Sequence, residues 1–197
     1  MERLETTRLI LRDWEISDLE DFYAYAKVQG VGEMAGWPHH TSIAVSTKLL
    51  NHFINTKDCY ALVLKATNQV IGSLAIHQKS MDPNYPATTQ RELGYVLSKD
   101  YWGQGLMLEA VSAAIYYVFE VLQVDALWCG HFTHNNQSRR VIEKVGFTFY
   151  TEGVYEAPLL QKNFPSKKYL FTRDDYFLGS KRLRPSDTTQ SFPHKQG

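Results

Sequence analysis

This chain of 197 residues has little of several features that would commit a protein to a specialised class. It has two cysteines, Cys59 and Cys129, both within strand-like runs, so buried reduced thiols are expected in place of a disulfide or a nucleophile. Its 21 lysines and arginines equal its 21 aspartates and glutamates, which leaves no electrostatic case for binding nucleic acid or an anionic membrane. No apolar run is long enough to span a bilayer, and the first residues lack the apolar segment of a secretory signal. These absences favour a cytoplasmic protein.

The two commonest phosphate-binding motifs are also absent, although one glycine-rich turn is present. Gly103 and Gly105 join a short apolar run to a long helical pattern. A P-loop would require a lysine and a hydroxyl residue after its last glycine, but Leu106, Met107 and Leu108 stand there. The dinucleotide-binding fingerprint would require a glycine or alanine at the position of Leu108. A glycine turn that opens a helix still favours anions, because the first amides lack partners and the helix dipole adds positive charge. A plain strand-to-helix turn is the alternative.

Apolar periodicity predicts strands interleaved with helices on one chain. Strands are predicted over residues 8–14, 60–65, 70–77, 91–98, 125–131, 147–155 and 168–171. Helices are predicted over residues 19–26, 41–55 and 106–122, and in a short segment after Asn135 that ends at Gly146. This mixture favours an α/β (α+β) sandwich. We expect one domain over residues 1–179, followed by a polar and mobile tail over residues 180–197.

Several short motifs follow one another in a fixed order along residues 4 to about 178. They are Thr7-Arg8-Leu9-Ile10-Leu11-Arg12, Ile71-Gly72, Glu92-Leu93-Gly94-Tyr95-Val96-Leu97, Trp102-Gly103-Gln104-Gly105, Glu109-Ala110, and Asn135-x-x-Ser138 with Gly146-Phe147. Each motif is weak alone, but the set is specific in this order and spacing. The sequence thereby resembles the GNAT superfamily of acyl-CoA-dependent N-acyltransferases. Within it, the sequence is most similar to the branch of the RimJ and RimL ribosomal-protein acetyltransferases and their small-molecule relatives.

The resemblance implies a GNAT fold, with a mixed and mostly antiparallel central sheet flanked by helices. Its two central parallel strands splay apart and hold acetyl-CoA between them; here they would be residues 91–98 and 125–131. The cofactor-binding residues implied are Val96, Leu97, Trp102, Gly103, Gln104, Gly105, Leu106, Met107, Asn135 and Ser138. The amides of the glycine turn would hold the pyrophosphate, the main chain of Val96 and Leu97 would pair with the pantetheine arm, and Asn135 would bind a pantetheine amide.

The same resemblance suggests which residues carry the chemistry. Ser138 is the expected general acid, since Ile142 stands where many GNAT enzymes have a tyrosine. The alternative is that Asn135 and Ser138 only cap their helix, which both residue types favour. Glu92 is the first choice for the general base, acting through water, and Glu152 is the second. Glu109 is expected to close a local hydrogen bond instead.

A metal site is not expected. His131-x-x-His134 lies near Cys129, but it straddles a strand end, where alternate side chains point in opposite directions, and no fourth ligand is evident.

The resulting hypothesis is an acetyl-CoA-dependent N-acetyltransferase that acts as a monomer or homodimer. The acceptor would be a primary amine, on a protein N-terminus or on a small molecule. Trp37, His40, Tyr85 and Tyr155 are candidate walls of the acceptor pocket. The rival from another class is a non-catalytic acyl-CoA sensor, and an antibiotic or polyamine acetyltransferase is the alternative among enzymes.

Overall fold

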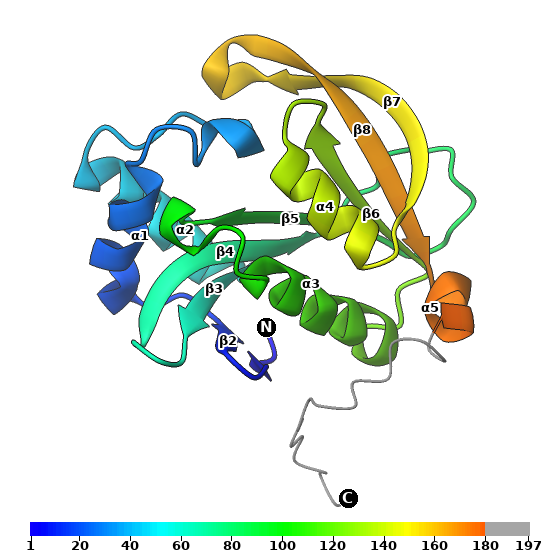
Figure 1. Cartoon of the computed structure of the whole chain (residues 1–197), viewed down its shortest axis with the longest axis horizontal. Helices are drawn as coiled ribbons and strands as arrows, with labels where there is room; N and C mark the ends of the chain where they lie inside the picture. Colours follow the sequence, from blue (N-terminus) through cyan, green and yellow to red (C-terminus); the bar gives the residue numbers. More distant parts are fainter. Residues whose placement is uncertain (180–197) are drawn as a thin grey trace, which may run out of the picture.

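The structure, a computed structural model, describes residues 1–179 of the chain. Its strands form one eight-stranded sheet in the order β1-β2-β3-β4-β5-β6-β8-β7 (Figure 1). All neighbouring strands are antiparallel except β5 and β6, which are parallel. The strands are β1 (Leu4–Glu5), β2 (Leu9–Arg12), β3 (Cys59–Leu64), β4 (Gln69–His77), β5 (Gln90–Leu97), β6 (Ala126–Phe132), β7 (Thr148–Ala157) and β8 (Lys162–Thr172). The sheet confirms the predicted fold class, and the predicted tail at 180–197 lies outside the described residues.

Helices cover both faces of this sheet (Figure 1). The helices are α1 (Leu19–Ala26), α2 (Ile43–Thr56), α3 (Leu106–Tyr116), α4 (Asn136–Lys144) and α5 (Arg173–Gly179). Because side chains alternate along a strand, one strand supplies two cores. In β3, Tyr60 and Leu62 pack into the large core under α3, whereas Ala61 and Val63 pack into a smaller core with α1 and α2. Among residues 1–179, no helix combines the length and the apolar character needed to cross a bilayer.

The two parallel strands separate part-way along the sheet. β5 pairs with β6 only from Gln90↔Ala126 to Leu93↔Cys129. Beyond that point β5 stays paired with β4 up to Leu97, and β6 stays paired with β8 up to Phe132. Each strand therefore follows its outer neighbour, and a wedge opens between residues 94–97 of β5 and residues 130–132 of β6. This is the splayed pair that the resemblance implied.

The β7–β8 hairpin is longer than the sequence predicted. The two strands pair from Thr148↔Leu170 to Ala157↔Lys162, and the hairpin arches beyond the wedge in Figure 1. The first half of β8 was not predicted because it is polar and contains Pro165. α5 was also not predicted; it follows the sheet directly, and Asp175 in its first turn accepts a hydrogen bond from Thr172 N.

Candidate active site

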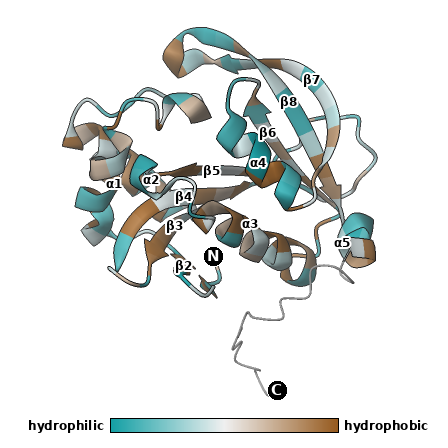
Figure 2. Ribbon diagram, in the orientation of Figure 1, coloured by the Kyte–Doolittle hydropathy of each residue, from teal (hydrophilic) through white to brown (hydrophobic). Residues whose placement is uncertain are grey.

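A cleft of about 480 Å³ lies in the wedge, between the start of α3, the start of α4 and the β7–β8 hairpin. Figure 2 shows the hydropathy of the elements around it. Strands β3 to β6 are largely hydrophobic, whereas α4 is hydrophilic along most of its length. The single side chain that α4 buries is Ile142, so the rest of that helix can present polar groups to the cleft.

The turn before α3 forms one wall of the cleft. Gly103 and Gly105 both have φ of +76°, a left-handed conformation that favours glycine. Gly105 is the N-cap of α3 and has no side chain to accept from the first-turn amides. Gly103, Gly105, Leu106 and Met107 line the cleft, and a methyl group added at Gly103 would meet no protein atom within 4 Å. The turn therefore presents unpartnered N–H groups to open space.

Gln104 was also predicted to bind the cofactor, but its side chain does not face the cleft as its neighbours do. It is outside the lining of the cleft, and its side-chain amide donates to Asp100 O at 3.0 Å. Its carbonyl oxygen accepts from Arg8 Nη1 at 2.9 Å. The Arg8 guanidinium is in turn held by Glu109, whose Oε2 lies 2.7 Å from Arg8 Nε. Gln104 and Glu109 therefore tie the turn to Arg8, the residue before β2; Glu109 makes this contact across 101 positions and not the local hydrogen bond that was expected of it.

Trp102 fixes the direction in which the chain leaves β5. Its indole Nε1 donates to Leu97 O at 2.8 Å, and the Lys99 ammonium lies 5.8 Å from the ring centroid. The side chain also lines the cleft. The indole therefore braces the turn against the end of the strand that leads into it.

The main chain of β5 presents alternate residues to the wedge. Ser98 N donates to Ile71 O of β4, and a methyl group at Gly72 of β4 would lie 2.3 Å from Val96 O. Val96 therefore turns its main-chain groups toward β4. By alternation, the main chains of Tyr95 and Leu97 face the wedge, where β6 no longer pairs with them. This differs from the expectation for Val96, which lines the cleft but whose carbonyl is directed at β4.

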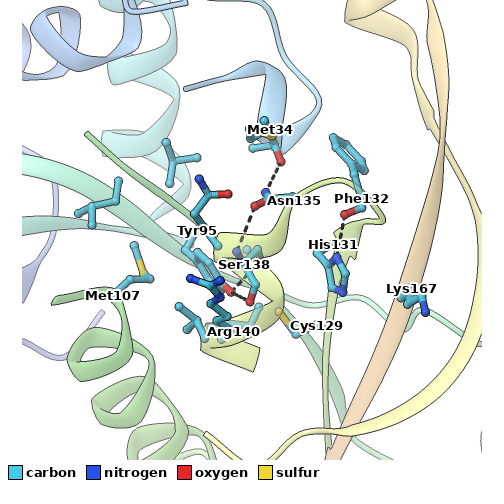
Figure 3. Close-up of a pocket in the computed structure, with 18 of the residues that line it drawn as sticks. Met34, Tyr95, Met107, Cys129, His131, Phe132, Asn135, Ser138, Arg140 and Lys167 are labelled. Carbon is cyan, nitrogen blue, oxygen red and sulfur yellow. Dashed lines mark hydrogen bonds between the residues drawn. The ribbon is translucent and has the colours of Figure 1, made fainter. Parts of the chain in front are cut away.

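Asn135 caps α4 and also bridges to a distant loop (Figure 3). Its Oδ1 accepts from Ser138 N at 3.0 Å, and its Nδ2 donates to Met34 O at 3.2 Å. Met34 belongs to the short 3-10 segment Glu33–Ala35, which lies over the cleft. Asn135 is buried and lines the cleft, with both ends of its side chain engaged. The capping role that the sequence left open is thus present.

Ser138 faces a tyrosine that the sequence did not single out. Tyr95 Oη lies 2.9 Å from Ser138 Oγ and 3.3 Å from Ser138 O, and both side chains line the cleft (Figure 3). In the sequence, Tyr95 shares a strand face with Leu93 and Leu97 and has no feature that marks a site residue. No local pattern marks a contact between residues 43 positions apart. Ile142 is buried, so α4 supplies no tyrosine at this point.

The two carboxylates considered as general bases have different environments. Glu92 lines the cleft, its side chain is 16% exposed, and Lys79 Nζ lies 3.1 Å from its Oε2. The two groups form an ion pair but not a hydrogen bond, because their geometry leaves Glu92 Oε2 without a hydrogen-bond donor. Glu152 is exposed, pairs with Lys167 at 3.2 Å, and is outside the lining of the cleft. Position therefore favours Glu92.

Of the four candidate acceptor walls, Tyr155 is the one that lines the cleft. Its ring lies 5.3 Å from that of Phe132, and a methyl group at Gly36 would lie 2.9 Å from it, so the hairpin closes against the loop that contains Met34. Trp37 lies outside the lining and packs 5.2 Å from the ring of His40.

His40 and Tyr85 are also outside the lining of the cleft. His40 is buried, its Nδ1 lies 2.7 Å from Ser46 Oγ, and burial lowers its pKa, with the neighbouring His39 adding to this. Tyr85 packs edge-on against Trp128 at 5.3 Å. Both residues therefore contribute to packing at these positions.

Cations outnumber carboxylates along the cleft. Among the described residues that line it, Arg140, Lys144, Lys167 and Lys168 carry positive charge, and Glu92 is the one carboxylate. Within residues 1–179, no group of three or more His, Cys, Asp or Glu side chains is placed to hold a metal ion. The site thus combines an excess of positive charge with unpartnered amides, which suits a polyanionic ligand.

Comparison with known proteins identifies the family. Residues 8–148 match the acetyltransferase (GNAT) domain. The chain belongs to the GNAT acetyltransferases. This GNAT chain is 26% identical over 167 residues to an uncharacterized N-acetyltransferase, YoaA, of Bacillus subtilis (strain 168), an alignment that covers 82% of this chain and 90% of the relative.

Solved structures share the GNAT fold at low sequence identity. A ribosomal-protein-S5-alanine acetyltransferase from Vibrio fischeri matches with a TM-score of 0.70 and 18% identity, covering 89% of this chain and 99% of that one. The microcin C7 self immunity acetyltransferase MccE, solved with acetyl-CoA and AMP, matches with a TM-score of 0.68 and 14% identity, covering 84% and 93%.

Proposed function

We propose that this GNAT domain transfers an acetyl group from acetyl-CoA to a primary amine within a ternary complex. The observation that carries the proposal is the start of α3, where unpartnered amides after two left-handed glycines face the cleft. Acetyl-CoA supplies an activated acetyl group as a thioester when it is bound.

Three sets of residues would hold acetyl-CoA. Amides of Gly103 to Met107 would bind the diphosphate, with the helix dipole adding attraction. Arg140 and Lys144 of α4 line the same cleft and would neutralise phosphate charge. The main chains of Tyr95 and Leu97 would pair with the amide-bearing arm as an added strand does.

The proton transfers fall to two residues on different elements. An alkylammonium has a pKa of about 10 and a peptide α-amine one of about 8, so the acceptor must lose a proton before it attacks. Glu92, the carboxylate in the cleft, would take that proton through water. Ser138 would donate its hydroxyl proton to the departing sulfur.

The charge of the cleft bears on the choice of acceptor. Glu92 is already paired with Lys79, and the lining has four further cationic side chains, so a polyamine or a polycationic antibiotic would meet like charge. A single primary amine, on a small molecule or on a protein N-terminus, fits better. We assign the chain to the RimJ/RimL-like branch on the sequence motifs, and propose that it acts in the cytoplasm as a monomer or homodimer.

Release of thiol from acetyl-CoA across a panel of amines tests the proposal. The panel would include free amino acids, peptides with free N-termini, a polyamine and an aminoglycoside, and Ser138→Ala would be compared with the wild type. We expect turnover with monoamines or peptides, and a loss of about 100-fold in kcat for Ser138→Ala. Calorimetric binding of acetyl-CoA without turnover on any amine would instead favour the rival reading, a non-catalytic sensor.

A further inference from the structure

Tyr95 contacts Ser138, the residue proposed to donate a proton to the departing sulfur. It lies on β5 two residues after the last parallel pair, Leu93↔Cys129, and its phenol reaches across the wedge to α4. Tyr95 Oη is 2.9 Å from Ser138 Oγ and 3.3 Å from Ser138 O. Within residues 1–179, Tyr95 is the one side chain hydrogen-bonded to that hydroxyl.

The surroundings keep this phenol protonated. The ring packs against the large core, with α3 on one side. Burial raises the pKa of Tyr95 well above its ordinary value of 10.0, and the nearby Cys129 acts in the same direction. Tyr95 therefore enters each cycle with its proton in place, on a ring that is packed against the core.

Ser138 alone is a poor source of protons. An ordinary thiol has a pKa of about 8.5 and tyrosine one of about 10, whereas a serine hydroxyl does not ionise in the range where proteins are stable. A serine that gives up its proton therefore needs a second donor behind it. Ile142, one turn further along α4, is buried in the core and lies outside the lining of the cleft, so it offers no such donor.

We propose that Tyr95 is the positioning residue for Ser138: it orients the serine hydroxyl toward the departing sulfur and replaces the proton that Ser138 donates. This inference rests on the proposed function. When the carbon–sulfur bond breaks, its electron pair stays on sulfur. The sulfur takes the Ser138 proton and Ser138 takes the Tyr95 proton. Solvent then reprotonates the phenolate. Glu92, which has passed the first amine proton to solvent, accepts through water the second proton that the amine nitrogen loses once the carbon–nitrogen bond has formed.

Tyr95→Phe tests the inference, because it removes the hydroxyl and keeps the ring. Tyr60→Phe is the matched control: Tyr60 is a buried tyrosine outside the cleft lining whose hydroxyl donates to Glu2 O at 2.8 Å. Both variants should lose similar thermal stability. We expect kcat to fall about 10- to 100-fold in Tyr95→Phe alone, with KM for acetyl-CoA and amine within about twofold of the wild type.

The double variant separates a shared role from two independent ones. If both hydroxyls act as one unit, Tyr95→Phe combined with Ser138→Ala should be no slower than Ser138→Ala alone. An unchanged kcat in Tyr95→Phe, or losses that multiply in the double variant, would overturn the proposal.

Calorimetry with coenzyme A and desulfo-coenzyme A gives a readout that does not need turnover. The hydroxyl pair should donate to the sulfur, so Tyr95→Phe should weaken coenzyme A about three- to tenfold and leave desulfo-coenzyme A unchanged. Equal affinities of the wild type and Tyr95→Phe for coenzyme A would refute the role of Tyr95 even in a protein that binds but does not acetylate. Failure of the wild type to bind coenzyme A would refute the proposed function as well.

Discussion

Substituting Gly103 in the turn before α3 should affect both the stability of the fold and the binding of coenzyme A, and a control variant can distinguish the two effects. Gly103 has φ of +76°, where an L-residue costs about 1–2 kcal/mol. In a chain of this size, 1 kcal/mol lowers Tm by about 2–4 °C, so Gly103→Ala should lower Tm by about 2–8 °C. No clash adds to this cost, because the new methyl group would meet no protein atom within 4 Å.

Gly146→Ala is the matched control for backbone strain. Gly146 follows α4 with φ of +100°, and its added methyl group would lie 3.7 Å from the Phe171 ring, an ordinary contact. It is outside the lining of the cleft. The two variants should therefore lose Tm to a similar extent, measured by thermal unfolding without ligand.

Binding of coenzyme A, measured by calorimetry, then distinguishes them. The methyl group of Gly103→Ala occupies the part of the cleft that we assign to the diphosphate. We expect its Kd to rise by about tenfold or more, equivalent to about 1.4 kcal/mol, and the Kd of Gly146→Ala to match the wild type. An unchanged Kd in Gly103→Ala, with Tm lowered as expected, would show that the diphosphate does not bind at this turn.

Three further predictions follow from other parts of the site. Glu92→Gln should lower kcat about 100-fold or more at neutral pH with KM for acetyl-CoA unchanged, as measured by initial rates; a loss below about threefold would exclude Glu92 as the base. Burial alone would raise the pKa of Glu33, but hydrogen bonds from His39 and from backbone amides hold it at about 2, below the ordinary 4.5. Since a depressed pKa stabilises the fold above the unfolded value, this part of the stability should be lost as pH falls from about 4.5 to 2. In denaturant titrations this pH-dependent part of the free energy of unfolding should amount to about 1–2 kcal/mol after screening, and Glu33→Gln should abolish it. The same pH dependence of stability in Glu33→Gln and in the wild type would contradict this. Coenzyme A should slow amide exchange at Tyr95 and Leu97, resolved by NMR, and unchanged rates at both would argue against pairing at this edge of β5.

Sequence patterns predicted the helices, strands and turns whose conformation depends on residues close to one another in the sequence. The apolar run of β3 and the apolar face of α3 depend on neighbours a few positions away, and so do the glycines before α3. Boundaries were less exact: the helix predicted to 122 changes at Tyr117 to a π-helical turn, Tyr117–Val121. Leu122, the last residue of the predicted helix, is 39% exposed.

Contacts between distant positions could not be predicted in this way. Asn135 reaches Met34 across 101 positions, and Tyr95 reaches Ser138 across 43. An aromatic residue in an apolar strand has the same signature whether its hydroxyl faces the core or a catalytic serine. For the same reason, the aromatic character of Trp37 could not distinguish a wall of the cleft from a packing residue.

The geometry of the wedge explains why one residue of β5 can serve both binding and catalysis. Beyond Leu93 no strand pairs with the inner edge of β5, so the main chain of Tyr95 needs a partner from water or from a ligand. The side chain of the same residue points out of the sheet plane toward α4, where it meets Ser138. A ligand arm paired along this edge would therefore place its far end at a fixed distance from the two hydroxyls. Tyr95→Phe leaves the main chain intact, so it removes the hydroxyl contact with Ser138 but keeps the main-chain groups that would bind the ligand. In that variant kcat should therefore fall while KM stays close to the wild-type value.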